Sequence, residues 1–351
     1  MKQYGIRAAL LMTVATPGFV LGLGNELAYT QNNPPSQHTA SGYLAKDHPI
    51  LINADLLIGR IIGQPTNAFL KTISNGETKH TTFDFDNEYR GGFRVGLGFG
   101  LRNDFNLSAQ WTRMSNGNSE FYQFADANQT ITDLQLPSGF QNTSIKDHKI
   151  DAFSRQKLRY QTVDLILQTA AWMLDSNLRF QPFGGVRYLY FRRHLTTKLE
   201  DKVDIGNDTS TNSFFRIRAI GVFLGTDVKY IIAKHFHFYS NVLLAILNGS
   251  QTRHYSGQSD ITGAVIQSEI NDEHFQISMN PQIELRFGFA WEHVFNNQWI
   301  LSLRVGYELA SLIHASAPAI TPGPTVTDAG PLRTNDVVKT QFIVVGFTLG
   351  F

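Results

Sequence analysis

Charged side chains alternate with large apolar ones along several segments of this chain, and this spacing is where its chemistry could lie. Between Gln276 and His293 (QISMNPQIELRFGFAWEH) most odd positions are apolar, whereas Glu284 and Arg286 occupy even positions. Because a β-strand places alternate side chains on opposite faces, this segment would have one apolar face and one ionic face. The ionic face could bind water or form ion pairs.

The same alternation recurs at 93–101, 105–112, 177–190, 299–309 and 343–351, and it predicts which charged residues share one face. If the apolar face meets lipid, these charged residues face inward. The inward set is Arg94, Arg179, Arg187, Lys229, Arg286 and Arg304 with Asp55, Asp164, Asp227, Glu284 and Glu308. Two interpretations remain open: a water-filled pore of mixed charge with weak ion preference, or a plug of structural salt bridges.

The alternating segments predict an all-β chain of about ten antiparallel strands. Their ranges are 50–62, 82–101, 104–116, 157–173, 176–194, 214–232, 235–248, 274–293, 298–313 and 337–351. The connections alternate between short turns and long polar loops, which fall at 63–81, 117–156, 195–213, 249–273 and 314–336. This is the layout of an outer-membrane β-barrel with short periplasmic turns and long extracellular loops. A hairpin hidden in 117–156 would raise the count to twelve strands.

Strand length and tryptophan positions favour a membrane barrel over a soluble sandwich. At about 3.3 Å per residue and a tilt near 40°, fifteen residues rise about 38 Å, which exceeds the apolar band of about 25 Å. Trp172, Trp291 and Trp299 lie beside short turns, and Trp111 lies toward the long-loop end. We expect these four side chains to form the aromatic girdles at the two interfaces.

The N-terminus and the composition set the domain organisation. Lys2 and Arg7 precede an apolar run that ends near Gly24, as in a secretory signal peptide. We expect a signal at 1–24, a periplasmic segment at 25–49 and the barrel at 50–351. The 351 residues carry 30 basic and 29 acidic side chains and no cysteine. This balance does not favour a nucleic-acid partner, and the lack of cysteine excludes a disulfide scaffold and thiolate metal sites.

Enzymatic chemistry is the competing hypothesis. His194, His254 and His314 lie near the long-loop end with Asp and Ser nearby, as a barrel hydrolase would require, but no G-x-S-x-G or similar motif is present. Gly96-x-Gly98-x-Gly100 lacks the strand-turn-helix context of a nucleotide loop, and inward glycines would instead make room for long side chains. His235 and His237 are interpreted as interfacial residues. We therefore expect no catalytic residues, no metal and no cofactor.

Several segments resemble one known family. FRVGLGFGLRNDFNLSAQWTRM (93–114) is similar to the MOMP-like pore-forming outer-membrane proteins of the Legionella and Chlamydia type. Other segments that resemble the family follow in the expected order: ILINADLLIG (50–59), LRYQTVDLILQ (158–168), LRFQPFGGVRYLYF (178–191), IELRFGFAWE (283–292) and VVGFTLGF (344–351). The chain departs from the family at Leu56-Leu57-Ile58, which replaces an aromatic pair, and in lacking the cysteines of chlamydial members.

The resemblance implies a porin-like diffusion pore for small hydrophilic solutes in the bacterial outer membrane, exposed at the cell surface. The implied partners are the lipid bilayer with its lipopolysaccharide, the barrel-assembly machinery that would read a last strand ending in Phe351, a host surface, and a second copy in a homo-oligomer. The alternative is a plugged barrel that acts as an adhesin or structural protein, with its function in loops 117–156 and 249–273. A barrel hydrolase is the third possibility.

Pro281 poses a separate problem for a closed barrel. Proline has no N–H to donate to a β-ladder, and a closed barrel has no free edge strand where this would not matter. We expect a bulge or a break in the ladder at Pro281, in the loop-side half of its strand.

Overall fold

The computed structural model describes residues 50–62, 67–75, 77–84, 89–101, 105–124, 129–133, 145–146, 150–201, 209–261, 264–295, 299–313 and 337–351. Every regular element within these ranges is a β-strand. None of the described residues belongs to a helix long and apolar enough to span a membrane. The predicted signal peptide and the segment 25–49 lie outside the described residues.

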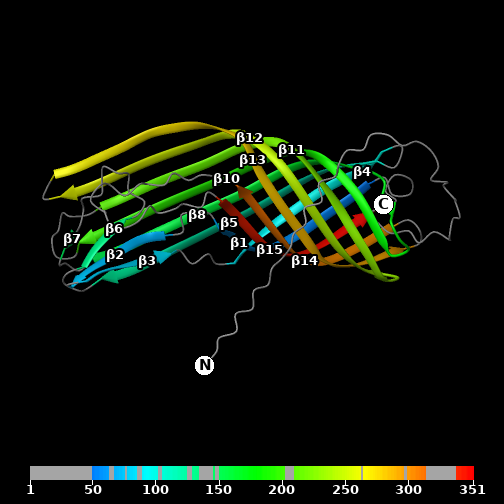
Figure 1. The fold of residues 1–351 in the computed structure, drawn as a ribbon, viewed down its shortest axis with the longest axis horizontal. Helices are drawn as coiled ribbons and strands as arrows, with labels where there is room; N and C mark the ends of the chain where they lie inside the picture. Colours follow the sequence, from blue (N-terminus) through cyan, green and yellow to red (C-terminus); the bar gives the residue numbers. More distant parts are fainter. Residues whose placement is uncertain are drawn as a thin grey trace, which may run out of the picture. The chain divides into compact units, whose positions relative to one another are not determined.

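Ten long strands pair into one closed antiparallel sheet (Figure 1). They are β1 (Ile50–Ile62), β4 (Arg90–Gly100), β5 (Asn106–Phe124), β8 (Ile150–Gln168), β10 (Leu178–Asp201), β11 (Thr209–Ala233), β12 (Phe236–Ile261), β13 (Ala264–Phe295), β14 (Trp299–Ile313) and β15 (Val337–Gly350). Consecutive strands are neighbours, and β15 pairs with β1 to close the circle. The predicted fold class and the strand count of ten are therefore confirmed.

The two ends of the barrel differ, and we call them the turn side and the loop side. On the turn side β11 and β12 are joined by residues 234–235, and the chain between β8 and β10 contains the two-residue strand β9 (Trp172–Met173), which pairs with β10. The first and last strands also meet at this end, where the backbones of Ile50 and Phe351 exchange two hydrogen bonds of 3.1 Å. Closure thus satisfies the backbone groups of both terminal strands, as an apolar environment requires.

The predicted loops at 195–213 and 249–273 are wrong over most of their length. The β10–β11 hairpin stays in register out to Leu199 and Thr209, and β12 pairs with β13 out to Ile261 and Ala264. At about 3.3 Å per residue and a tilt near 40°, the 32 residues of β13 rise about 80 Å, far more than the apolar band requires. The sequence analysis assigned strands only where alternate residues are apolar. A strand needs an apolar outer face only where it contacts lipid, so the polar extensions of these strands were missed.

A second, smaller sheet forms within the other predicted loops. Its strands are β2 (Asn67–Asn75), β3 (Glu77–Asp84), β6 (Gln129–Asp133) and β7 (Ile145–Lys146), in the order β3-β2-β6-β7. The segment 117–156 therefore does contain extra strands, but they pair outside the barrel, and β5 and β8 themselves extend into it to Phe124 and from Ile150. Figure 1 shows the small sheet at the loop-side end.

The expected irregularity near Pro281 is present two residues away. Leu247 pairs with Asn280 and Gly249 pairs with Ile277, so Asn248 faces two residues of β13. Met279, one of those two, has a φ of 53° and its N–H donates to Asn248 Oδ1 at 2.6 Å. On the other edge the pairing of β13 with β14 ends at Gln282. A β-bulge and the end of the β13–β14 ladder thus flank Pro281, but Pro281 itself stays in register opposite Ile246, so the irregularity is near it and not at it.

Candidate functional site

Eight of the eleven predicted inward residues form one continuous chain of ion pairs, which we call the charge chain. In order along the chain they are Asp164, Arg187, Glu284, Arg286, Glu308, Arg94, Asp55 and Arg304. Four arginines thus meet four carboxylates, and the chain is electrically balanced. Inside a barrel this arrangement satisfies charges that would otherwise be costly to bury.

The charge chain crosses the lumen instead of following one wall. Arg187 on β10 donates to both oxygens of Asp164 on the neighbouring strand β8, each at 2.7 Å, and to Glu284 on β13, three strands away, also at 2.7 Å. Arg94 on β4 reaches Glu308 on β14, again three strands away, at 2.6 and 2.7 Å. These bridges hold opposite parts of the wall together and narrow the passage between them.

A second bridge joins still more distant strands. Gln282 on β13 donates to the hydroxyl of Tyr160 on β8 at 3.1 Å, and both side chains are buried. Parity predicts that Gln282 faces inward with Glu284 and Arg286, whereas Tyr160 was not predicted as a site residue. It lies on the loop side of the charge chain and marks the boundary with an apolar layer.

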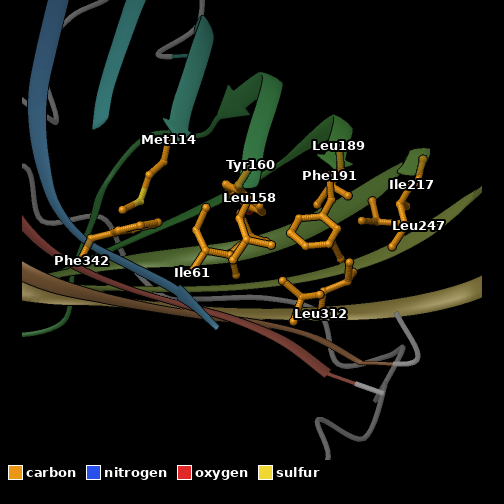
Figure 2. Packing of buried hydrophobic residues seen from close by; sticks show 14 of the residues in the cluster. Ile61, Met114, Leu158, Tyr160, Leu189, Phe191, Ile217, Leu247, Leu312 and Phe342 are labelled. Carbon is orange, nitrogen blue, oxygen red and sulfur yellow. The ribbon is translucent and has the colours of Figure 1, made fainter. Parts of the chain in front are cut away.

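Directly on the loop side of the charge chain the interior contains a cluster of apolar side chains, which the sequence analysis did not predict. Figure 2 shows this apolar cluster, whose members come from most strands of the wall. It includes Leu57, Ile61, Met114, Leu158, Leu189, Phe191, Phe215, Ile217, Leu247, Leu312 and Phe342. Phe191 and Phe215 pack edge to face with ring centroids 6.1 Å apart. Charged and apolar layers together close this part of the barrel.

A cavity of about 240 Å³ lies on the turn side of the charge chain. Seven of the predicted inward residues line it: Asp55, Arg94, Asp164, Asp227, Lys229, Arg286 and Arg304. Its wall also includes Leu51, Asn106, Gln168 and Thr348, which lie within two residues of strand ends on the turn side. The cavity therefore extends from the charge chain to the mouth of the barrel at that end.

The remaining charged residues lie around this cavity. Asp227 accepts hydrogen bonds from Asn241 at 2.6 Å and from Gln168 at 3.1 Å. Nearby, Nζ of Lys229 lies 3.7 Å from Oε2 of Glu292. Arg179 is buried opposite Lys229 across the β10–β11 pair. Glu292 was missed by the sequence analysis, although its parity matches that of Glu284 and Arg286.

Comparison with known proteins places this barrel in a family. Residues 52–351 match the family described as the Legionella pneumophila major outer membrane protein precursor. The chain belongs to this family. It is therefore an outer-membrane protein of the β-barrel type, and its apolar outer face contacts the lipid bilayer. The resemblance noted in the sequence is confirmed. No curated protein matches the chain by sequence.

Several solved structures align with the chain at very low identity and low TM-score. The outer-membrane protease OmpT from Escherichia coli is 10% identical, with 90% of this chain and all of that chain covered and a TM-score of 0.42. The Pseudomonas putida toluene transporter TodX is 7% identical, with 90% and 94% covered and a TM-score of 0.23. A Pseudomonas aeruginosa FadL homologue is 6% identical, with 87% and 90% covered and a TM-score of 0.25. At these values neither protease nor transporter activity transfers to this family member.

Three of the four tryptophans are exposed, and Trp291 is half-buried near the turn-side end of β13. Trp172 and Trp299 are exposed beside turn-side connections, and Trp291 stacks on His293 with ring centroids 5.7 Å apart. Trp111 is exposed on β5 and packs edge to face on Phe93. Phe351 lies against Trp299 at 5.3 Å. All five rings are thus on or near the outer surface.

The histidines do not assemble into a site. His237 is buried inside and lines the cavity, so its interfacial interpretation is wrong, whereas His235 lies in the turn with Nδ1 2.9 Å from the Glu292 carbonyl oxygen. His194 is half-buried on the outer face of β10, and His314 lies outside the described residues. Within the described ranges no three His, Cys, Asp or Glu side chains are grouped to hold a metal ion.

Gly346 gives the charge chain room, which is the role that the sequence analysis proposed for Gly96, Gly98 and Gly100. A Cβ on Gly346 would lie 1.8 Å from Asp55 Oδ1. A Cβ on Gly96 would collide with Asn53, which is outside the charge chain, and a Cβ on Gly98 would meet nothing nearer than 3.4 Å, so the proposal does not hold for Gly98. We therefore expect Gly346→Ala to displace the Asp55 carboxylate from Arg304 and to lower the free energy of unfolding by about 1–3 kcal/mol. Urea unfolding in detergent micelles measures this. Gly98→Ala is the matched control, and an equal loss in both variants would contradict the steric explanation.

Proposed function

We propose that this family member is a narrow outer-membrane channel for small hydrophilic solutes, and that the charge chain forms its constriction. The observation that carries this proposal is the turn-side cavity, whose wall is lined by charges of both signs and which reaches the mouth of the barrel. A barrel with a purely structural interior would have no use for a roomy charged cavity, because buried polar groups without partners are costly.

Unpartnered polar atoms in the cavity wall support a hydrated interior. Asn106 Oδ1 and Gln110 Oε1 are buried, line the cavity and have no hydrogen-bond partner among the described residues. Such atoms are normally satisfied by ordered water, and a volume of about 240 Å³ holds several water molecules. Water in this half of the lumen would let a small solute exchange its hydration shell for charged side chains.

The conformation described is the closed one, so conduction requires the bridges to open. Arg94–Glu308 and Arg187–Glu284 span the lumen, and the apolar cluster lies beyond them. Because four arginines share four carboxylates, a bridge can break while each charge keeps another partner or gains water. We infer a pore of low conductance with weak preference between anions and cations.

Planar-bilayer recording of the purified protein tests the proposal. We expect small stepwise currents with a reversal potential near zero in a salt gradient, since the charge chain is balanced. The control is protein left unfolded in urea and added at the same concentration. Absence of steps both from the wild type and from a variant with a widened constriction would contradict a channel function.

A surface scaffold is the second candidate, and the long hairpins favour it. β12 and β13 remain paired far beyond the bulge at Met279, and a channel needs no such extension. The test joins Ser250 to Gln276, which are paired in the structure, through a two-residue Asn-Gly turn. Loss of adhesion to host cells with unchanged conductance would support the scaffold function, whereas unchanged adhesion would contradict it.

We also propose roles for the residues at the barrel rim. Trp111, Trp172, Trp291 and Trp299 would anchor the barrel at the interfaces, and Phe351 would end the strand that the barrel-assembly machinery reads. We further propose that the barrel assembles into a homo-oligomer. No catalytic role is proposed for His194 or His254.

A further inference from the structure

A row of three arginines crosses three neighbouring strands on the outer face of the barrel. Arg159 on β8 pairs directly with Arg192 on β10, and Arg192 pairs directly with Arg216 on β11. All three side chains point outward, because the residues before and after each of them are buried inside. Three like charges in adjacent register positions are an unusual arrangement, because like charges directly opposite each other on a sheet are destabilising.

Further cations extend this row on both sides. On the loop side Lys157 pairs with His194, and Arg155 pairs with Thr196; on the turn side Arg218 pairs with Tyr190. We call Arg155, Lys157, Arg159, Arg192, Arg216 and Arg218 the basic patch. The nearest carboxylates described on the same outer faces are Asp151 and Glu200, toward the far ends of β8 and β10. Among the described residues, no carboxylate forms an ion pair with a member of the patch.

The outward-facing cations are densest in one sector of the barrel, although single ones also lie on β1 (Arg60), β5 (Arg113) and β15 (Lys339). Neighbouring β12 presents Ser250 opposite Arg218 and Thr252 opposite Arg216, and β14 presents Ser311 and Ile313 on its outer face at the loop-side end. Six cations are concentrated on β8, β10 and β11, and three of them lie directly opposite one another. This local concentration points to one anionic partner.

Two arginines of the row, Arg192 and Arg216, are held in place before any ligand binds. The guanidinium carbon of Arg192 lies 4.8 Å from the centroid of the Phe214 ring, and that of Arg216 lies 5.5 Å from the same ring. Arg216 also donates from Nη2 to Thr252 Oγ1 at 3.3 Å, while its Nε has no hydrogen-bond partner among the described residues. Cation–π contacts hold these two side chains against Phe214 and leave N–H groups to donate.

The position of the patch relative to the membrane identifies the kind of partner. Toward the turn side the same three strands present exposed Val163, Tyr188 and Ile220, and then exposed Leu165, Val186 and Val222. The cations therefore begin at the loop-side edge of the apolar belt. A molecule that contacts both surfaces must carry acyl chains and anionic groups within one structure.

We propose that the basic patch binds the phosphate groups of a phosphorylated glycolipid in the outer leaflet, with the acyl chains of that lipid lying along Val163, Leu165, Val186 and Val222. Arginine forms bidentate hydrogen bonds with phosphate, and three adjacent arginines can bind two phosphate groups of one head group. The bound anion would also remove the repulsion between Arg159, Arg192 and Arg216.

His194 provides a local probe of this binding. Its pKa is lowered from the ordinary value of 6.5 by partial burial and then by the positive charges of Arg192, Lys157 and Arg155. A phosphate placed among these cations would offset their effect, so the pKa of His194 should rise when the glycolipid binds. A lipid held only by its acyl chains would leave this pKa unchanged.

The experiment compares binding of diphosphoryl lipid A with that of its dephosphorylated form by native mass spectrometry of the barrel in detergent. We expect retention of diphosphoryl lipid A to fall at least about tenfold in an Arg159→Gln/Arg192→Gln variant, since charge-assisted hydrogen bonds to phosphate are lost. Lys339→Gln, an exposed cation on β15 outside the patch, is the matched control and should retain wild-type binding.

Each other outcome overturns the proposal. Equal retention of the dephosphorylated lipid would show that phosphate is not recognised, and competition by inorganic phosphate at equal concentration would show a simple anion site. Wild-type retention by the double variant would show that the patch is not the site. Folding of the variant is checked by urea unfolding, and lipid-free protein should be at least as stable as the wild type because two repulsive charges are removed.

Discussion

Arg187→Met is expected to lower the free energy of unfolding by about 3–5 kcal/mol, the largest stability effect of any single substitution in this barrel. The Arg187 side chain is 1% exposed and donates three hydrogen bonds of 2.7 Å to Asp164 and Glu284. Its loss would leave the Asp164 carboxylate buried without its arginine, whereas Glu284 would keep Arg286. Urea unfolding of the folded barrel in micelles, followed by tryptophan fluorescence, measures the change.

A double variant separates the uncompensated charge from the lost packing. Arg187→Met/Asp164→Leu removes both members of the pair, so no carboxylate is left without a partner at this position. We expect the double variant to recover a large part of the stability that Arg187→Met loses, because apolar replacement of a whole buried pair is often neutral. The stability lost by the double variant is also compared with the sum of the losses of Arg187→Met and Asp164→Leu measured singly. If it equals that sum, the Arg187–Asp164 pair does not contribute as the geometry indicates.

Outer-face substitutions provide the reference for both measurements. Lys339→Gln removes an exposed cation of β15 that lies outside the basic patch and does not touch the lumen, and substitutions of this kind usually change stability by less than about 0.5 kcal/mol. A loss as large as that of Arg187→Met would indicate that general charge, and not the bridge across the lumen, determines the effect.

The inward positions of the eleven charged residues could be predicted because side-chain parity in a strand is strict. Once one face of β13 is assigned to lipid, Glu284 and Arg286 must point inside, and the same argument gives Asp164 and Arg187 on their own strands. Parity does not say which inward groups meet. The bridge from Arg187 to Glu284 spans three strands, and its existence depends on the curvature of the closed wall.

The apolar cluster and the long hairpins escaped prediction for a common reason. The sequence analysis assumed a polar interior and an apolar exterior. This holds only where the outer face of a strand contacts lipid and its inner face lines a hydrated lumen. On β10 the inward Leu189 and Phe191 and the outward Arg192 reverse this pattern on the loop side. The change from apolar-out to apolar-in near Tyr190 is the signal that could have located both the upper edge of the lipid belt and the filled interior.

Opening both layers of the lumen is expected to produce the largest functional change. Arg94→Ala and Glu308→Ala remove a bridge that crosses the lumen, and Phe191→Ala removes a ring from the apolar cluster beyond it. The deleted pair is electrically neutral, so the remaining charge chain still has equal numbers of arginines and carboxylates. We therefore expect the triple variant to show a severalfold larger single-channel conductance with little change in reversal potential.

Two comparisons give this prediction its specificity. Glu308→Ala alone leaves an excess of positive charge at the constriction, because Arg94 and Arg286 lose a shared partner, and it should shift the reversal potential toward anion preference. Leu224→Ala with Lys339→Ala makes similar truncations on the outer face, outside the basic patch, and should leave the conductance unchanged. A triple variant that folds but conducts no better than the wild type would place the barrier elsewhere in the barrel. In that case the charge chain and the cluster would be structural, and the surface scaffold would become the better explanation of this fold.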